Sequence, residues 1–201
     1  MDTMDTDISR IIKRILSGKK QEFALLVNAH QVKVMSLCLS ILRNQTEADD
    51  AAQEIFIKAY RNLAKFRQES SFSTWLYRIT YYHCLDMIKA RNRKQTMPLD
   101  DMADYNKEKP FEPDHSTTAM QKLEDKEEIN RILEELSPEY RLVLTLRIVE
   151  DLSYDEIAKI TKTSLDSVKA RLKRARLSLQ EKARHFHEKQ SSKQVEVQNG
   201  S

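Results

Sequence analysis

Residues 152–176 read LSYDEIAKITKTSLDSVKARLKRAR. The first part predicts a short helix over 154–161, because Ser153 and Glu156 have the spacing of a capping box. A turn of about four residues follows, and Thr163 or Ser164 can then cap a second helix that runs to about residue 184. The apolar sides of the two helices are Ile157, Ala158 and Ile160, then Val168, Leu172, Ala175 and Leu179. Two helices joined in this way predict a helix-turn-helix.

The second of these helices carries most of the positive charge. Residues 159–184 hold nine lysines and arginines against two acids, and only Asp166 interrupts the bases before Gln180. Pairing within the helix therefore cannot account for the charge, which argues against an ordinary solvated helix. On a helical wheel the outward residues are Ser167, Ala170, Lys173 and Arg174, flanked by Lys169, Arg171 and Arg176. We predict that this helix enters the major groove, with Lys173 and Arg174 at base edges and the flanking bases at phosphates.

Glycine is almost absent from the 201 residues. Only Gly18 and Gly200 occur, against an average of about 7%. Tight hairpins and phosphate-binding loops need a left-handed backbone that glycine supplies best, so sheets, P-loops and Rossmann turns are excluded. An apolar fraction of 40% and a charged fraction of 32% fit amphipathic helices. The sequence predicts an all-α protein.

Periodicity and charge divide the chain into two small helical domains. The expected ranges are a first domain over 8–94, a linker over 95–122, a second domain over 123–188 and a disordered tail over 189–201. The linker contains three prolines and lies within a segment, 97–128, whose net charge is −6. This composition is typical of a flexible, solvated tether.

Capping residues predict where the other helices begin. In the first domain, Thr46 is the expected N-cap of one helix and Ser73 that of the next. In the second domain, Ser137 and Pro138 have the pattern of an N-cap followed by proline at the first helical position.

The helix predicted over 75–91 has two stripes of large side chains. One stripe holds Trp75, Arg78, Tyr82, Asp86 and Lys89, and the other holds Tyr77, Tyr81, Leu85 and Ile88. A single core cannot bury both, so one stripe must face another subunit or a ligand. Aromatic side chains beside basic ones are typical of sites that hold single-stranded nucleic acid. We therefore place the first stripe against nucleic acid; the alternative is that Trp75 or Tyr82 is a plain core residue.

An acidic patch precedes that helix in the chain. Glu47 and Asp49 lie in the first turn of the helix capped near Thr46, where the helix dipole accounts for them. Asp50, Gln53 and Glu54 extend beyond that turn on one side. An acidic face would repel DNA, so we predict that these three residues bind a basic protein partner.

Three blocks in this order resemble those of a known family. The blocks are Asp50-Ala-Ala-Gln-Glu-Ile-Phe56, Phe66-Arg-Gln-Glu-Ser-Ser-Phe-Ser-Thr-Trp-Leu-Tyr-Arg-Ile79, and Leu152 to Ala158 with Ser167 to Arg176. Together they resemble regions 2 and 4 of an extracytoplasmic-function (ECF) sigma factor of the sigma-70 family. Lys162 stands where the family's helix-turn-helix usually has glycine, and Tyr82 where an asparagine is common.

The resemblance implies a subunit of bacterial RNA polymerase that acts in the cytoplasm and binds promoter DNA. Asp50, Gln53 and Glu54 would bind the clamp coiled coil of the largest polymerase subunit, and the flap would be a second contact. An anti-sigma factor is also implied. The residues implied in minus-ten recognition and melting are Arg67, Ser70, Ser71, Phe72, Trp75, Arg78, Tyr82 and Lys89.

Two other functions were weighed against this one. A conventional helix-turn-helix regulator accounts for 129–184 but gives the acidic face and the Trp75 stripe no task. An enzyme would have to use His83, Cys84, His185 and His187, most of which have simple surface or core explanations. We expect neither catalysis, nor a metal, nor a cofactor. Cys38 and Cys84 are expected to be reduced core thiols, and no apolar run approaches a membrane span.

Overall fold

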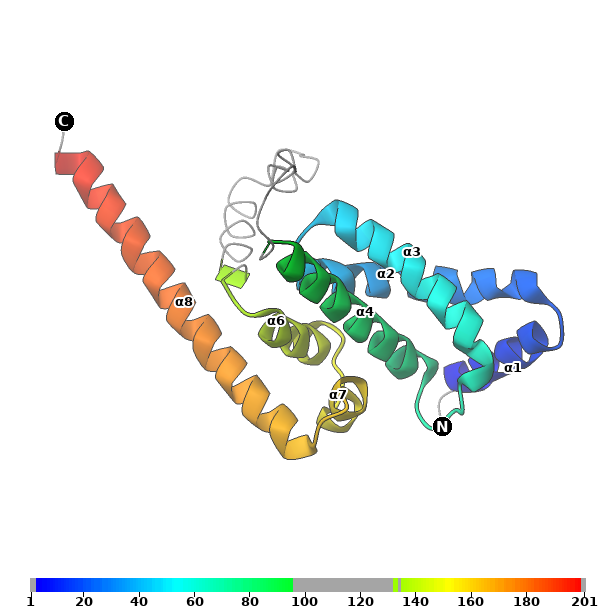
Figure 1. Ribbon diagram of the computed structural model, residues 1–201. Coiled ribbons are helices and arrows are strands. Elements are labelled where there is room, and N and C mark those ends of the chain that lie inside the picture. The colour runs from blue at the N-terminus through cyan, green and yellow to red at the C-terminus, as the bar shows by residue number, and fades with distance from the viewer. Residues whose placement is uncertain (1–2, 96–131, 134, 200–201) are drawn as a thin grey trace.

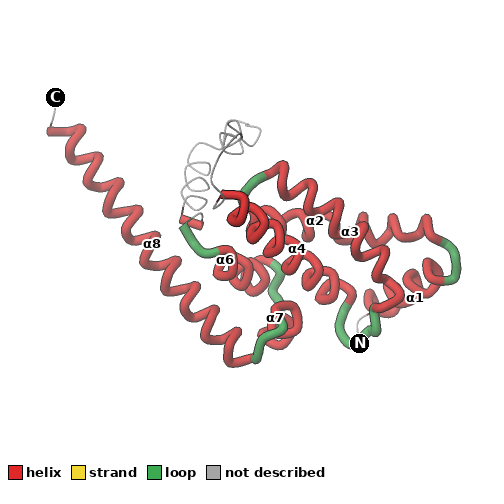
Figure 2. Tube along the Cα trace, in the orientation of Figure 1, coloured by secondary structure: helices red, strands yellow, loops and turns green. Residues whose placement is uncertain are grey.

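The computed structural model describes residues 3–95, 132–133 and 135–199 of the chain. Every regular element in these ranges is helical, which confirms the predicted all-α fold (Figure 2). The predicted linker over 95–122 lies outside the described residues, except for residue 95.

The first domain packs around one central helix, α2. Its elements are α1 (Thr3–Leu16), the 3₁₀ turn η1 (Lys20–Glu22), α2 (Phe23–Leu42), α3 (Gln45–Asn62), the 3₁₀ turn η2 (Leu63–Lys65) and α4 (Phe72–Gln95). Helices α1, α3 and α4 all contact α2 (Figure 1). The Sγ atoms of Cys38 and Cys84 lie 3.8 Å apart between α2 and α4, and both thiols are free and buried.

The segment Lys20–Leu42, which includes α2, is long and apolar enough to cross a membrane. The sequence analysis expected no apolar segment of that length. Leu26, Val34, Leu37 and Ile41 are fully buried in the domain core. A helix that others cover on several sides meets the same criterion, so this single stretch is weak evidence for a membrane span.

Two helix starts differ from the prediction. The N-cap of α3 is Asn44, whose Oδ1 accepts a hydrogen bond from the backbone N–H of Glu47 at 2.8 Å, and Thr46 lies inside the helix. At α4, Ser71 Oγ accepts from the N–H of Thr74 at 3.1 Å, so the helix begins before Ser73. Asparagine caps more strongly than threonine, which explains the choice at α3.

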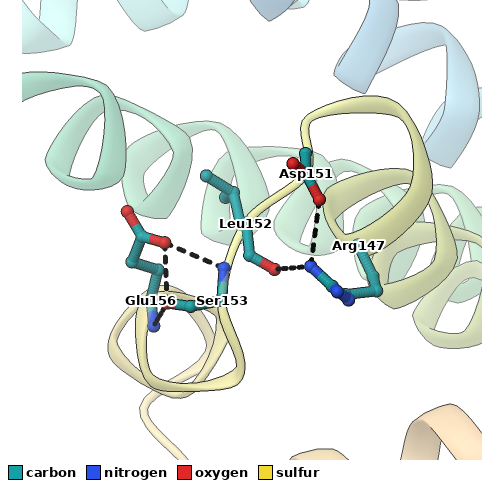
Figure 3. A network of polar contacts seen from close by, with 5 residues as sticks. All are labelled: Arg147, Asp151, Leu152, Ser153 and Glu156. Carbon is teal, nitrogen blue, oxygen red and sulfur yellow. Dashed lines mark hydrogen bonds and ion pairs between the residues drawn. The ribbon is translucent and has the colours of Figure 1, made fainter.

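The second domain contains the helix-turn-helix. Its elements are α6 (Pro138–Leu144), the π-helical turn η3 (Thr145–Val149), α7 (Tyr154–Thr161) and α8 (Leu165–Asn199). The predicted cap at Ser137 and the capping box at Ser153 are both present. Figure 3 shows the box, in which the N–H of Ser153 donates to Glu156 Oε2 at 2.8 Å. In the same view, Arg147 donates to Asp151 Oδ1 and to the carbonyl oxygen of Leu152, which fixes the turn ahead of α7.

Helix α8 is longer than predicted. It continues to Asn199, through most of the segment 189–201 that we expected to be a disordered tail. Neither proline nor glycine occurs between Leu165 and Asn199, so nothing in the sequence ends the helix before Gly200. In Figure 1 its C-terminal part extends away from the other helices.

The two domains pack against each other, α6 on α2 and α7 on α4. The buried guanidinium of Arg141 joins them at the first contact. Its Nε donates to the carbonyl oxygen of Ser40 at 2.8 Å, and its Nη2 donates to that of Ile41 at 3.0 Å. These carbonyls end α2 and have no partner within the helix, so Arg141 supplies one from the other domain. We call this packing the docked arrangement.

Candidate nucleic-acid interface

The basic face of α8 is open to solvent. The predicted inward residues Val168, Leu172 and Ala175 are buried, which confirms the orientation of the helix. The residues exposed on its other faces are Ser167, Lys169, Ala170, Lys173, Arg174 and Arg176. The N-terminus is capped by Ser164, whose Oγ accepts from the N–H of Ser167 at 3.2 Å. A duplex therefore has access to this surface without any rearrangement of the helix.

Arg171 does not belong to that surface. Its side chain is only 19% exposed, and its Nε lies 3.8 Å from Glu139 Oε2 of α6. The sequence grouped Arg171 with the phosphate-contacting residues, but the structure turns it towards the domain interior. The helical wheel could not separate these positions, because it does not include the neighbouring helix that carries Glu139.

The acidic face of α3 is exposed as the sequence suggested. Asp50, Gln53 and Glu54 are all exposed, and within the described residues the one ion pair that they make is a 4.0 Å contact between Glu54 and Lys58. Glu47, by contrast, pairs with Arg91 of α4 at 3.1 Å. Glu47 therefore has a partner within the domain, whereas the side chains of Asp50, Gln53 and Glu54 are exposed on one side of α3.

The aromatic residues at the start of α4 form a packed cluster. Trp75 is 7% exposed and Phe72 is 1% exposed. The ring centroid of Trp75 lies 5.4 Å from that of Phe66 and 5.6 Å from that of Phe72. In this arrangement neither side chain is an exposed platform for a base, which favours the alternative that Trp75 is a core residue.

A cavity of about 660 Å³ lies beside this cluster. Its walls come from the loop before α4, from α4 itself and from α7 of the other domain. The predicted minus-ten residues among its lining are Arg67, Ser70, Trp75 and Arg78. Ser71 instead caps α4, and Lys89 is exposed on a later turn of the same helix.

The second stripe of α4 faces the second domain. The Tyr77 hydroxyl donates to Glu150 Oε2 at 2.7 Å, and Lys33 Nζ lies 3.6 Å from the same carboxylate oxygen. Burial, and then Glu150 itself, raise the pKa of Tyr77, so the hydroxyl remains the donor. The sequence required another subunit or a ligand on one stripe; the neighbour here is the chain's own second domain.

Tyr82 is also held by the second domain. Its hydroxyl donates to the carbonyl oxygen of Thr161 at 3.2 Å, and Lys162 Nζ lies 5.5 Å from the centre of its ring. Tyr82 remains 36% exposed, but its polar end is occupied. Sequence reasoning missed Arg141, Glu150 and Thr161, and no local pattern marks them as contacts between domains.

Comparison with known proteins agrees with this geometry. The family model described as Sigma-70 region 2 matches residues 26–94, and the one described as Sigma-70, region 4 matches residues 126–179. The RNA polymerase sigma-H factor of Pseudomonas aeruginosa is 36% identical over 183 residues, which are 88% of this chain and 93% of the relative. The chain belongs to the ECF sigma factors of the sigma-70 family. The ECF factor SigW of Bacillus subtilis is 33% identical, over 90% of this chain and 99% of its own length.

Solved structures of other sigma factors share the fold. CnrH in complex with the cytosolic domain of CnrY has a TM-score of 0.60 at 23% identity and covers 85% of this chain and 92% of its own. The sigma factor RpoE of Bartonella quintana, solved with the anti-sigma factor NepR, has a TM-score of 0.63 at 20% identity, with 82% and 98% covered. ECF sigma factors are transcription initiation factors, and this sigma factor has both DNA-binding regions of the family.

Proposed function

We propose that this sigma factor binds core RNA polymerase through α3, recognises the minus-thirty-five element through α8 and acts on the non-template strand at the minus-ten element through α4 and the loop before it. The observation that carries the proposal is the coexistence of two exposed faces of opposite charge. The basic face of α8 suits a duplex, and Asp50, Gln53 and Glu54 on α3 suit a basic protein. A helix-turn-helix regulator that does not bind polymerase would leave the acidic face of α3 without a binding partner.

On this proposal the protein is not an enzyme, and duplex opening depends on the polymerase. Opening about ten base pairs costs on the order of 14 kcal/mol at ~1.4 kcal/mol per step. Capture of one or two flipped bases gives ~1–3 kcal/mol each, which is too little. The sigma factor therefore starts the bubble, with Arg67, Ser70 and Arg78 around the captured base, and the polymerase supplies the remaining energy.

Strand capture also requires the docked arrangement to open. Trp75 lines the cavity together with Lys159 of α7, and the Tyr82 hydroxyl bonds to the last residue of α7. We propose that binding to core polymerase separates α7 from α4, which frees the Tyr82 hydroxyl and opens the side of the cavity that Lys159 lines. The site of action is then the cytoplasm, and an anti-sigma factor is the expected inhibitor, since the similar CnrH and RpoE were solved with CnrY and the anti-sigma factor NepR.

The test of the proposal is a double substitution on α3. Asp50→Lys with Glu54→Lys reverses the charge of the exposed face without touching a buried residue. Copurification with core polymerase should be abolished, and run-off transcription from the cognate promoter should be lost with it. Helical circular dichroism should be unchanged.

The matched control reverses two exposed acids elsewhere, Asp7→Lys with Glu181→Lys, which gives the same change in net charge. This variant should retain core binding. Wild-type core affinity in the Asp50 and Glu54 variant would rule out the assignment of α3.

A further inference from the structure

We propose that the docked arrangement forms a binding site for a small polyphosphate anion, in the cleft between α4 and α7. This site is separate from the contact with core polymerase. It uses residues of both domains and exists only while they are packed together.

Two cavities meet in this cleft. The cavity of about 660 Å³ has Lys65, Arg67, Arg78 and Lys159 in its lining, with Glu69 as its carboxylate. A second, of about 450 Å³, has Lys58, Lys65, Arg78 and Lys162 in its lining, with Asp86 as its carboxylate. They share Lys65, Trp75 and Arg78, so they lie side by side. Volumes of this size suit a small ligand.

The charges in this space are unbalanced. Six lysines and arginines line it against two carboxylates. Lys58 has partners, Glu54 at 4.0 Å and His83 Nδ1 at 2.6 Å. Burial, and then Lys58, lower the pKa of His83. The imidazole therefore accepts this bond in its neutral form, and it does not neutralise the charge of Lys58.

The other cations in the cleft make no ion pair within the part of the chain that the structure describes. These are Lys65, Arg67, Arg78, Lys159 and Lys162, of which the last contacts only the ring of Tyr82. Packing α7 on α4 brings the two lysines of the second domain towards the three cations of the first. Like charges brought together in this way oppose docking, unless an anion lies between them.

The backbone at Lys162 is a second, independent observation. It ends α7 in the left-handed conformation, with φ 53° and ψ 44°. Glycine adopts this conformation readily, whereas a residue with a Cβ adopts it at a steric cost. Arg43, Gln68 and Asp151 also have a positive φ, but of these four described residues only Lys162 lines either cavity.

A small anion fits this space better than a strand of nucleic acid does. Each cavity has one lysine of the second domain in its lining, Lys159 or Lys162, so a small anion contacts both domains at once. Trp75 and Phe66 also line the larger cavity and can contact an aromatic base. The ligand class is therefore a phosphate chain, either free or attached to a nucleoside. By linkage, such an anion favours the docked arrangement and opposes strand capture.

The experiment uses the full chain and its single tryptophan. Trp75 lines both cavities and is the only tryptophan of the sequence, so its fluorescence reports on the cleft directly. Inorganic tripolyphosphate is titrated at low salt into the wild type and into Lys159→Gln with Lys162→Gln. Both lysines are exposed, so the fold should be unaffected.

The expected result is saturable binding that weakens at least about tenfold in this double variant, as the loss of charge-assisted contacts requires. Lys13→Gln with Lys20→Gln removes two exposed lysines from α1 and η1 and should bind as the wild type does. Equal weakening in both variants would show general charge attraction and overturn the proposal, as would no weakening in either.

Two further probes identify the ligand. Adenosine triphosphate is titrated without magnesium. Tighter binding than that of tripolyphosphate indicates that the ligand is a nucleoside polyphosphate, and equal binding indicates the phosphate chain alone. Both results support the site. A short oligothymidylate that loses as much affinity as tripolyphosphate in the Lys159 and Lys162 variant would make the cleft a strand groove and overturn the proposal. Core binding is measured separately, so failure of this site leaves the proposed function untouched.

Discussion

The two helices that we propose to contact DNA, α8 and α4, differ in accessibility. Helix α8 presents Lys173, Arg174 and Arg176 to solvent, whereas α4 has Trp75 and Tyr77 buried, with Tyr77 covered by the second domain. A surface that recognises an intact duplex can act as a rigid body. A surface that holds a flipped base is useful only after opening begins, and on the proposal above the second domain covers α4 until then.

The contacts that cover α4 are separable. They are the hydrogen bonds of the Tyr77 and Tyr82 hydroxyls, whereas the guanidinium of Arg141 joins the second domain to α2. Interfaces between domains of one chain are commonly polar and allow relative motion. We therefore predict that substitutions at the interface between the domains change the accessibility of α4 and leave that of α8 unchanged.

The largest effect is expected at Trp75, which tests whether the covered helix carries a core residue. Trp75→Ala removes the ring that packs on Phe66 and Phe72 and should lower the free energy of unfolding by ~3–5 kcal/mol. Urea unfolding of the full chain measures this loss. Trp75→Phe keeps an aromatic ring and should lose less. Unchanged stability in Trp75→Ala would return Trp75 to the role of an exposed reader.

Tyr77→Phe tests how α4 is covered. It removes only the hydroxyl that donates to Glu150, a hydrogen bond to a charged group that contributes ~1.5–3 kcal/mol. The docked arrangement should loosen, which small-angle scattering detects as a larger radius of gyration. Tyr60→Phe, at an exposed tyrosine of α3, is the control. Equal radii in all three proteins would mean that this hydrogen bond does not hold the domains together.

At α8, two arginines distinguish base recognition from phosphate binding. Arg174→Ala should cost ~1–3 kcal/mol on the cognate promoter and little on scrambled DNA. Arg176→Ala should weaken both alike and reduce the salt slope by about 0.9. Binding of the full chain to both duplexes across a salt series measures these effects. Arg171 is unsuitable as the phosphate contact, because it pairs with Glu139. If Arg176→Ala reduces the specificity and Arg174→Ala weakens binding to both duplexes alike, the helix lies in the groove in a different rotation from the one proposed.

The smallest effect is a dependence on pH that is confined to the first domain. His30 Nδ1 donates to the carbonyl oxygen of Leu26 at 2.9 Å, and Nε2 lies 3.2 Å from Ser73 Oγ. Burial is the main cause that lowers the pKa of His30, and nearby Lys33 adds to it. The folded state thus binds fewer protons than the unfolded state, so stability is complete above the ordinary pKa of about 6.5 and falls as the pH drops below it.

Unfolding of the wild type and of His30→Gln at about pH 7.5 and about pH 5.5 measures this loss. The variant should be less sensitive to acid, and the exposed His185→Gln should behave as the wild type does. Identical acid sensitivity in His30→Gln would exclude His30 as the cause.

Local signals in the sequence predicted most of the helices and their buried faces. They could not predict the contacts between the two domains. The capping box at Ser153 and the buried side of α8 follow from spacings of a few residues, and both are present. Thr46 and Ser73 failed as caps because a second capping residue stood two positions earlier. The cover on Tyr77 depends on Glu150, 73 residues later, and no periodicity within a helix carries that information.

The docking of the domains also sets an order during synthesis. Arg141 bonds to carbonyls about 100 residues earlier, and Tyr82 to a carbonyl 79 residues later. The first domain is complete when α4 ends at Gln95, but α7 ends only at Thr161. At ~5–20 residues per second, a ribosome needs on the order of 3–13 s to make that stretch. For those seconds every newly made chain has its α4 uncovered, so each molecule passes through the open form before it first docks.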